Sequence, residues 1–271
     1  VSGEARPLRV GTKAFTEQYI LGELVGAWIS DEEGRASRQV TSLGSTVAFD
    51  ALRASEIDLY VDYSGTIWAT IMGQAGFSER GTVLGEVEDF LREEHGIALV
   101  ARLGFENTYA LAVRSDLAKA RELENLSDLA KISQDLSIGG DLEFFARTEW
   151  KALVATYGFR FREKRTMDPA LMYQAAALGE VDAISAFSTD GRIAAYELAV
   201  LDDDRGVIPP YDTILLARPG FEEEFPGVSS ALRRLEGRIS AEAMREANLG
   251  VDRDERSPAA VARDLAATLR E

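Results

Sequence analysis

Short apolar runs alternate with helical segments along most of the 271-residue chain, and this alternation limits the fold more than any other feature of the sequence. Apolar runs bounded by turn residues are typical of buried strands, whereas apolar positions spaced three and four apart indicate helices. The resulting order of strand, helix and strand predicts an α/β fold. The expected strands are residues 8–11, 39–41, 57–61, 97–101, 108–113, 136–139, 183–186 and 214–217, and the expected helices are residues 17–29, 47–54, 81–94, 143–157 and 169–178.

Polar residues and prolines at segment boundaries predict where helices begin. Thr16 is the expected N-cap of the first helix, and Ser45 or Thr46 that of the second. In the C-terminal tail, Pro226 and the Ser257-Pro258 pair are typical of helix starts. The tail is therefore expected to be helical.

A weak internal repeat divides the chain into two similar halves. Residues 51–65 read ALRASEIDLYVDYSG and residues 175–191 read AAALGEVDAISAFSTDG, so that Tyr63 aligns with Phe187. The pattern predicts two α/β lobes, each with an aromatic residue at the carboxyl edge of its sheet, where open α/β sheets bind ligands. A general helix–turn–strand unit produces the same pattern, so the repeat alone leaves both interpretations open.

Cations and aromatic residues recur near the predicted sheet edges. Lys13 and Arg147 follow the first strand of each half, close to helix N-termini, where anions are favoured and where an arginine fork matches a carboxylate. Aromatic faces attract quaternary ammonium groups, which cannot donate hydrogen bonds. These residues predict a pocket for a methylated-ammonium zwitterion, although strand-end tyrosines also pack lobes together and surface cations are commonly solvated. The aromatic candidates are Tyr63, Tyr109, Phe187 and Tyr211.

Composition excludes several classes of function. A net charge of −16 argues against nucleic acid as a partner, which needs a basic face. The sequence has no cysteine and one histidine, His95, so thiol chemistry and histidine-rich metal sites are excluded and no cofactor is expected. His95 sits at a predicted helix end, where a cap is the expected role.

The N-terminal residues 1–7 are short and polar and lack an initiator methionine, which indicates a removed signal peptide. Trimming of the sequence at this point is the alternative. We expect a periplasmic or otherwise extracytoplasmic protein, and a lipid anchor on a removed cysteine is compatible with this start.

Beyond these patterns, ordered segments across nearly the whole chain resemble the glycine betaine/carnitine/choline-binding proteins of osmoprotectant ABC transporters. The ordered set is far more specific than any one segment. The segments are VGTKAFTEQYILGEL, LGSTVAFDALRASEIDLYVDYSGTIW, FENTYALAV, EFFAR, YQAAALGEVDAISAFSTDG and LDDDRGVIPPY.

The resemblance implies a two-lobed, hinged periplasmic-binding-protein fold of type II, with the ligand in the cleft between the lobes. Residues 1–106 and 212–271 would form the first lobe and residues 107–211 the second. The implied ligand is a betaine-type quaternary ammonium compound, such as glycine betaine, carnitine or choline. The implied macromolecular partner is the membrane permease of an ABC importer, and a monomer is expected.

The resemblance also implies the binding residues. The implied carboxylate site consists of Lys13, Thr66 and Arg147, and the implied aromatic box of Tyr63, Tyr109, Tyr211 and Phe187. Phe187 stands where the family often has tyrosine. Phenylalanine keeps the π-face of the ring but lacks the hydroxyl. Gln18 is a secondary candidate in the first helix.

Two other readings remain open from the sequence. One is an enzyme on the same architecture, because fold does not determine function. Asp62 and Asp190, beside the two repeat aromatics, are its candidate carboxylates, although Asp190 also suits a helix N-cap. The other is a binding protein for a different zwitterion, such as an amino acid, which would require an acidic partner for its ammonium group.

Overall fold

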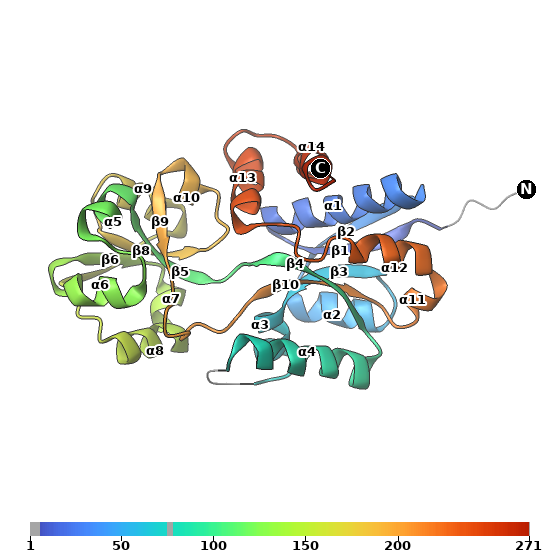
Figure 1. The fold of residues 1–271 in the computed structure, drawn as a ribbon, viewed down its shortest axis with the longest axis horizontal. Coiled ribbons are helices and arrows are strands. Elements are labelled where there is room, and N and C mark those ends of the chain that lie inside the picture. The colour runs from blue at the N-terminus through green and yellow to red at the C-terminus, as the bar shows by residue number, and fades with distance from the viewer. Residues whose placement is uncertain (1–5, 75–77, 271) are drawn as a thin grey trace, which may run out of the picture. The chain divides into compact units, whose positions relative to one another are not determined.

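The computed structural model describes residues 6–74 and 78–270, and the chain divides into two compact units (Figure 1). Val1–Glu106 and Pro210–Glu271 form the first unit, and Asn107–Pro209 forms the second. Residues 210 and 211, which the sequence placed in the second lobe, lie in the first unit in this division. Both are bonded within it, since the Ser64 hydroxyl lies 3.2 Å from the Pro210 carbonyl oxygen and the Tyr211 N–H lies 3.1 Å from a Glu106 carboxylate oxygen.

Each unit contains one mixed sheet, five-stranded in the described ranges 6–74 and 78–270. In spatial order, the first sheet consists of β2 (Ser37–Leu43), β1 (Leu8–Lys13), β3 (Leu59–Tyr63), β10 (Asp212–Ala217) and β4 (Ala98–Glu106). In spatial order, the second sheet consists of β7 (Glu163–Thr166), β6 (Ser137–Gly140), β8 (Ala183–Phe187), β5 (Tyr109–Arg114) and β9 (Leu198–Leu201). This architecture confirms the predicted α/β class.

Helices cover both faces of the first sheet, because successive strand residues point to opposite sides. Leu59 and Val61 pack with α1, α12, α13 and α14, whereas Tyr60 packs on the other face with α2 and α4 (Figure 1). The helical elements of this unit are α1 (Thr16–Glu33), α2 (Ser45–Arg53), α3 (Ser64–Thr66), the π-helical turn η1 (Ile67–Ile71), α4 (Arg80–His95), α11 (Phe221–Glu224), α12 (Pro226–Arg233), α13 (Ala241–Asp252) and α14 (Pro258–Thr268).

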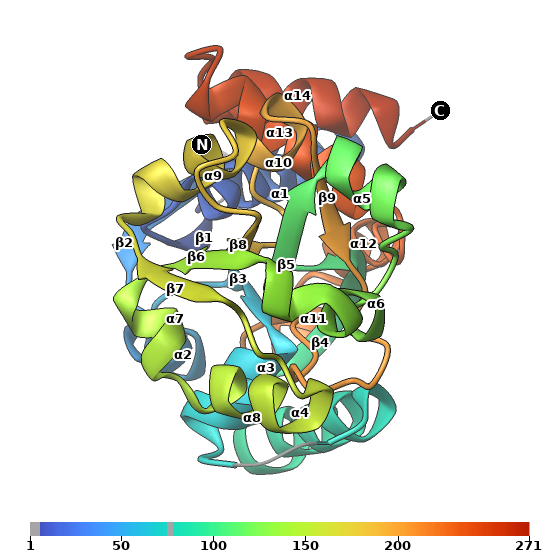
Figure 2. The same ribbon diagram turned by 90° about the vertical axis from the view of Figure 1, so that its left-hand side faces the viewer.

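The second unit repeats this layering (Figure 2). Leu111 and Val113 of β5 pack with α6 and α8, whereas Ala112 packs on the opposite face with α9 and α10. The helical elements of this unit are α5 (Ser115–Arg121), α6 (Leu126–Ile132), the 3-10 turn η2 (Ser133–Asp135), α7 (Leu142–Ala146), α8 (Thr148–Tyr157), α9 (Pro169–Ala177) and α10 (Arg192–Ala195).

Some predicted element ends were wrong. Thr16 is the first residue of α1 rather than its cap, and the cap position is held by Phe15 without a side-chain hydrogen bond. Gly44 precedes α2, so neither Ser45 nor Thr46 caps that helix. In the tail, Ser257 and Pro258 begin α14 as predicted, and the Ser257 hydroxyl accepts the Ala260 N–H.

The helix predicted over residues 143–157 is broken into α7 and α8 by Arg147, whose backbone is extended. A sequence pattern cannot reveal this break, because the apolar spacing continues across it. Helices α5, α6 and α10 and strands β7 and β9 were not predicted; β7 reads EKRT and contains no apolar run.

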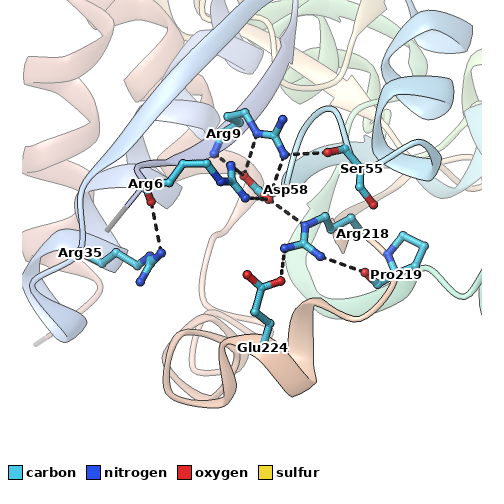
Figure 3. A network of polar contacts seen from close by, with 8 residues as sticks. All are labelled: Arg6, Arg9, Arg35, Ser55, Asp58, Arg218, Pro219 and Glu224. Carbon is cyan, nitrogen blue, oxygen red and sulfur yellow. Dashed lines mark hydrogen bonds and ion pairs between the residues drawn. The ribbon is translucent and has the colours of Figure 1, made fainter. Parts of the chain in front are cut away.

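A buried carboxylate holds together the amino-terminal edge of the first sheet. Asp58, just before β3, has no exposed side-chain surface and lies 2.9, 3.1 and 2.8 Å from guanidinium nitrogens of Arg6, Arg9 and Arg218 (Figure 3). Arg218 also pairs with Glu224. Burial alone would raise the pKa of the Asp58 carboxyl, but the three arginine hydrogen bonds hold its pKa well below the usual range. The cluster joins β1, β3 and the end of β10.

Replacing Asp58 with asparagine should destabilise the protein by about 3 kcal/mol at pH 7, because three guanidinium groups lose their shared counter-charge. A carboxyl whose folded-state pKa is lowered stabilises the fold above its unfolded pKa of about 3.9 and loses that contribution as the pH falls below it. The stability difference between wild type and Asp58→Asn should therefore shrink below about pH 4. Denaturant unfolding at several pH values measures both.

Asp50→Asn is the matched control, since Asp50 pairs with Arg53 on an exposed helix face. Its effect should stay within about 0.5 kcal/mol at any pH. A comparable loss in both variants would show that the Asp58 cluster has no special role.

Candidate functional site

Sheet topology gathers the candidate residues of the first unit at one edge. β1 and β3 are parallel, so their final residues, Lys13 and Tyr63, lie at the same edge of the sheet. β10 is antiparallel to β3 and begins at this edge, where Thr213 is paired with Tyr63. The chain also leaves the unit after Glu106 and returns at Pro210, at the ends of the paired strands β4 and β10.

Lys13 is buried and held by a carboxylate. Its ammonium nitrogen lies 2.7 Å from Asp62 Oδ1, and their side chains are 10% and 0% exposed. The same carboxylate oxygen accepts the Tyr63 N–H at 2.8 Å. Burial, together with the Asp62 charge, raises the pKa of the neighbouring Tyr60 hydroxyl far above its usual range, so this phenol stays neutral. Because its side chain is 10% exposed and paired with Asp62, Lys13 is not a solvated surface lysine. Asp62 accepts one of the three N–H groups of its ammonium.

Gln18 and Glu17 of α1 fix the Tyr63 side chain. The Gln18 amide nitrogen lies 3.1 Å from the Val61 carbonyl oxygen and 3.3 Å from the Tyr63 hydroxyl. The Gln18 Oε1 atom accepts the backbone N–H of Lys13. The Tyr63 hydroxyl donates to Glu17 Oε1 at 2.5 Å. Gln18 thus links β1, β3 and α1.

Thr66 and Tyr211, the remaining candidates of this unit, lie beside the same strand end. Thr66 closes the short helix α3 directly after β3 and is partly buried. Tyr211 packs against Gly65, where a Cβ would lie 2.7 Å from both the Tyr211 ring and the Pro210 carbonyl oxygen. Glycine is therefore required for this close approach. We call Lys13, Gln18, Tyr63, Thr66 and Tyr211 the first half-site.

A charged cluster at the start of β10 was not predicted. Arg80 Nε lies 3.0 Å from each oxygen of the buried Asp212 carboxylate. Asp212 of β10 lies opposite Glu106 of β4 in the antiparallel register. Burial and the Asp212 charge raise the pKa of the Glu106 carboxyl. The sequence offered no signal for this cluster, because its members lie far apart along the chain.

The second unit brings Tyr109, Phe187 and Arg147 together at one sheet edge, and we call these three the second half-site. Tyr109 and Phe187 are directly paired in the antiparallel β5–β8 register, with ring centroids 4.9 Å apart. The Arg147 guanidinium carbon lies 4.9 Å from the Tyr109 ring centroid, and the guanidinium lies 3.5 Å from Glu149. Phe187 is 41% exposed, so it is not a core residue.

The two alternative catalytic carboxylates, Asp62 and Asp190, each bind a cation of their own unit. Asp62 binds Lys13 in the first unit. Asp190 binds the backbone N–H and the guanidinium of Arg192 in the second unit, at the start of α10. Each carboxylate therefore has a structural partner within its own unit.

Metal sites and membrane-spanning helices are absent from the part of the chain that the structure describes, residues 6–74 and 78–270. No group of three histidine, cysteine, aspartate or glutamate side chains there has the arrangement of a metal site. No helix within those ranges combines the length and hydropathy required to cross a bilayer.

The site residues that sequence reasoning missed are Glu17 and Asn248, while Asp62 was considered only as a catalytic carboxylate. Asn248 of α13 donates from Nδ2 to Glu17 Oε2 at 3.3 Å. A signal for Glu17 existed in its place beside Gln18 in the first turn of the expected helix. Asn248 had none, since it lies 231 positions away along the chain.

Two α/β units joined by strand-end crossings have the architecture of two-lobed periplasmic solute-binding proteins, and the family to which the chain belongs consists of such binding proteins rather than enzymes. Residues 6–267 match the substrate-binding domain of ABC-type glycine betaine transport systems. The chain belongs to this family, which confirms the predicted resemblance. Substrate-binding proteins of ABC importers are extracytoplasmic.

Similar proteins support this assignment. The chain is 32% identical over 264 residues to an ergothioneine transport permease/ergothioneine-binding protein of Helicobacter pylori, with 97% of this chain aligned but only 47% of that longer protein. It is 30% identical to the carnitine transport binding protein of Listeria monocytogenes, covering 95% of this chain and 85% of the relative. A crystal structure described as a glycine betaine/carnitine/choline ABC transporter aligns with a TM-score of 0.93 and 29% identity, over 97% of this chain and 98% of that one.

Proposed function

We propose that this protein captures a betaine-type zwitterion, carrying a quaternary ammonium group and a carboxylate, for import by an ABC permease. The observation that carries the proposal is the pairing of Tyr109 with the exposed Phe187 beside Arg147. The partly buried Tyr109 ring and the exposed Phe187 ring offer π-faces to an ammonium, and the neighbouring guanidinium offers a fork to a carboxylate at the same sheet edge. The relatives support the choice of ligand, since ergothioneine and carnitine each carry a trimethylammonium group and a carboxylate.

In the proposed mechanism, one ligand engages both half-sites. Tyr63, Tyr109, Phe187 and Tyr211 supply the aromatic box, and Lys13, Thr66 and Arg147 bind the carboxylate, with Gln18 in support. The Asp62 contact orients the Lys13 ammonium and leaves donors for a ligand oxygen. Each unit holds part of the site, so ligand favours the state in which both are engaged, and that state is the form we propose the permease recognises. The two units would act as the lobes of a monomer.

A thermal-shift panel tests the proposed function directly. The ligands are glycine betaine, proline betaine, carnitine, choline, ectoine and ergothioneine, with glycine as the primary-ammonium counterpart of glycine betaine. A bound ligand at 100 times its dissociation constant stabilises the fold by about 2.7 kcal/mol. We expect at least one quaternary ammonium compound to raise the melting temperature and glycine to have no effect. Stabilisation by glycine alone would instead indicate an amino-acid binder.

Arg147→Ala should weaken glycine betaine binding by about a hundredfold, because the carboxylate loses a charged two-point partner. Choline has no carboxylate, so its affinity should fall by less than about fivefold. Calorimetric titration of both ligands measures the difference. Arg205→Ala is the control, since Arg205 lies over the Tyr157 ring at 5.2 Å in the same unit but outside the second half-site. Equal losses for the two ligands would place Arg147 outside the carboxylate site.

Phe187→Ala should weaken binding by roughly tenfold, because it removes one cation–π contact. Phe187→Tyr should keep or raise affinity, since tyrosine restores a hydroxyl to the same ring position. The exposure of Phe187 predicts a small change in unfolding free energy for both variants. Unchanged affinity in Phe187→Ala, measured by titration alongside unfolding of the free protein, would remove Phe187 from the site.

A further inference from the structure

Glu17 is a buried carboxylate that the proposed aromatic box and carboxylate clamp do not use. It lies in the first turn of α1, is 2% exposed, and accepts the Tyr63 hydroxyl at 2.5 Å and the Asn248 amide at 3.3 Å. A carboxylate this deeply buried is costly unless it is hydrogen-bonded, and the Tyr63 hydroxyl is one of its donors. Its position is therefore tied to the orientation of Tyr63.

The Tyr63 ring is held on several sides. Phe15 stacks against it with centroids 6.4 Å apart, and Gln18 Nε2 reaches its hydroxyl at 3.3 Å. The backbone N–H of Tyr63 is bonded to Asp62. Its hydroxyl proton points to Glu17, which fixes the end of the ring farthest from the backbone. An aromatic wall held in this way loses little further freedom when a ligand binds.

The hydrogen bond from Tyr63 to Glu17 also changes the charge distribution of the ring. A phenol that donates to a carboxylate is polarised, so that its π-face becomes more negative. A more negative face attracts a quaternary ammonium more strongly. This effect matters here because the Lys13 ammonium lies 5.2 Å from the centroid of the same ring and would repel a second cation. Asp62 offsets that charge at 2.7 Å, and Glu17 adds a second carboxylate on the hydroxyl side.

Helix chemistry alone does not account for Glu17. An acidic residue in the first turn stabilises a helix, but an exposed one does so equally well. Here the carboxylate is directed into the protein, between β3 and α13, and each oxygen has a donor from a different element. The arrangement serves Tyr63 rather than the end of α1.

We infer that Glu17 is a positioning residue for ligand recognition: through its hydrogen bond to the Tyr63 hydroxyl it makes that ring a cation-selective wall, and Asn248 holds the carboxylate in place. This inference rests on the proposed binding of a quaternary ammonium compound. Glu17, which lies behind the aromatic box rather than in it, would then discriminate between a ligand with a quaternary ammonium group and one of the same shape with a quaternary carbon in its place.

The test compares glycine betaine with 3,3-dimethylbutanoate, in which carbon replaces the quaternary nitrogen and the shape and carboxylate are kept. The dissociation constant of 3,3-dimethylbutanoate divided by that of glycine betaine measures selectivity for the positive charge. Glu17→Gln keeps an acceptor for Tyr63 but removes the charge, and should lower this ratio by about tenfold, mainly through weaker glycine betaine binding. A purely structural role would weaken both ligands equally and leave the ratio unchanged.

Tyr63→Phe keeps the ring and removes only the hydroxyl, so the ratio should fall similarly. In the double variant it should fall no further, because both changes break the same interaction. Asp252→Asn is the matched control, since it removes a carboxylate that links α13 to α1 at Thr16 Oγ1, 2.6 Å away, without contacting Tyr63. Its ratio should equal that of the wild type.

The outcomes separate the two hypotheses. If wild-type protein shows no preference for glycine betaine over the carbon analogue and no quaternary compound in the panel binds, the proposed function itself fails. If wild type prefers glycine betaine but Glu17→Gln keeps the full ratio, only the role of Glu17 is overturned. Should Glu17→Gln not fold, an unchanged ratio in Tyr63→Phe overturns it equally.

Discussion

The buried ion pair between Lys13 and Asp62 is the interaction on which the first half-site depends. It joins the ends of the parallel strands β1 and β3 and places a cation beside the Tyr63 ring without leaving its charge unmatched. A buried ammonium without a counter-charge would be destabilising, and Asp62 supplies that counter-charge to Lys13. Tyr63 is then oriented by two carboxylates, one at its backbone N–H and one at its hydroxyl.

A buried aspartate lies at each end of β3, Asp58 just before the strand and Asp62 near its last residue, and the two bind different cations. Asp58 lies at the amino-terminal edge among three arginines, where it joins β1 and the end of β10. Asp62 lies at the carboxyl edge with a single lysine. Guanidinium groups present several donors in a rigid fork and suit a permanent joint, whereas a lysine keeps donors that can rotate toward a ligand. The amino-terminal edge of β3 thus uses guanidinium groups, and the carboxyl edge, where we propose that the ligand binds, uses an ammonium group.

The α/β class, most long elements and the candidate residues could be predicted from the sequence. Residues 8–11, 183–186 and 214–217 lie within the observed strands, because apolar runs report burial reliably. The break at Arg147 and the short elements could not be predicted, since apolar spacing carries no information about one extended residue between two helices. Tyr109 and Phe187 were each named from the sequence, but their direct pairing follows only from the β5–β8 register.

The sequence by itself determined the family of this protein and the types of side chain available for a zwitterion, because ordered motifs and residue chemistry are local properties of the chain. Only the tertiary structure decided which groups those side chains contact. Gln18, expected as a pocket residue, bonds to β1, β3 and the Tyr63 hydroxyl, and Glu17 and Asn248 meet although 231 positions separate them. Hydrogen bonds and ion pairs form between groups that folding brings within about 3 Å, and such distances are set by packing across elements rather than by spacing along the chain.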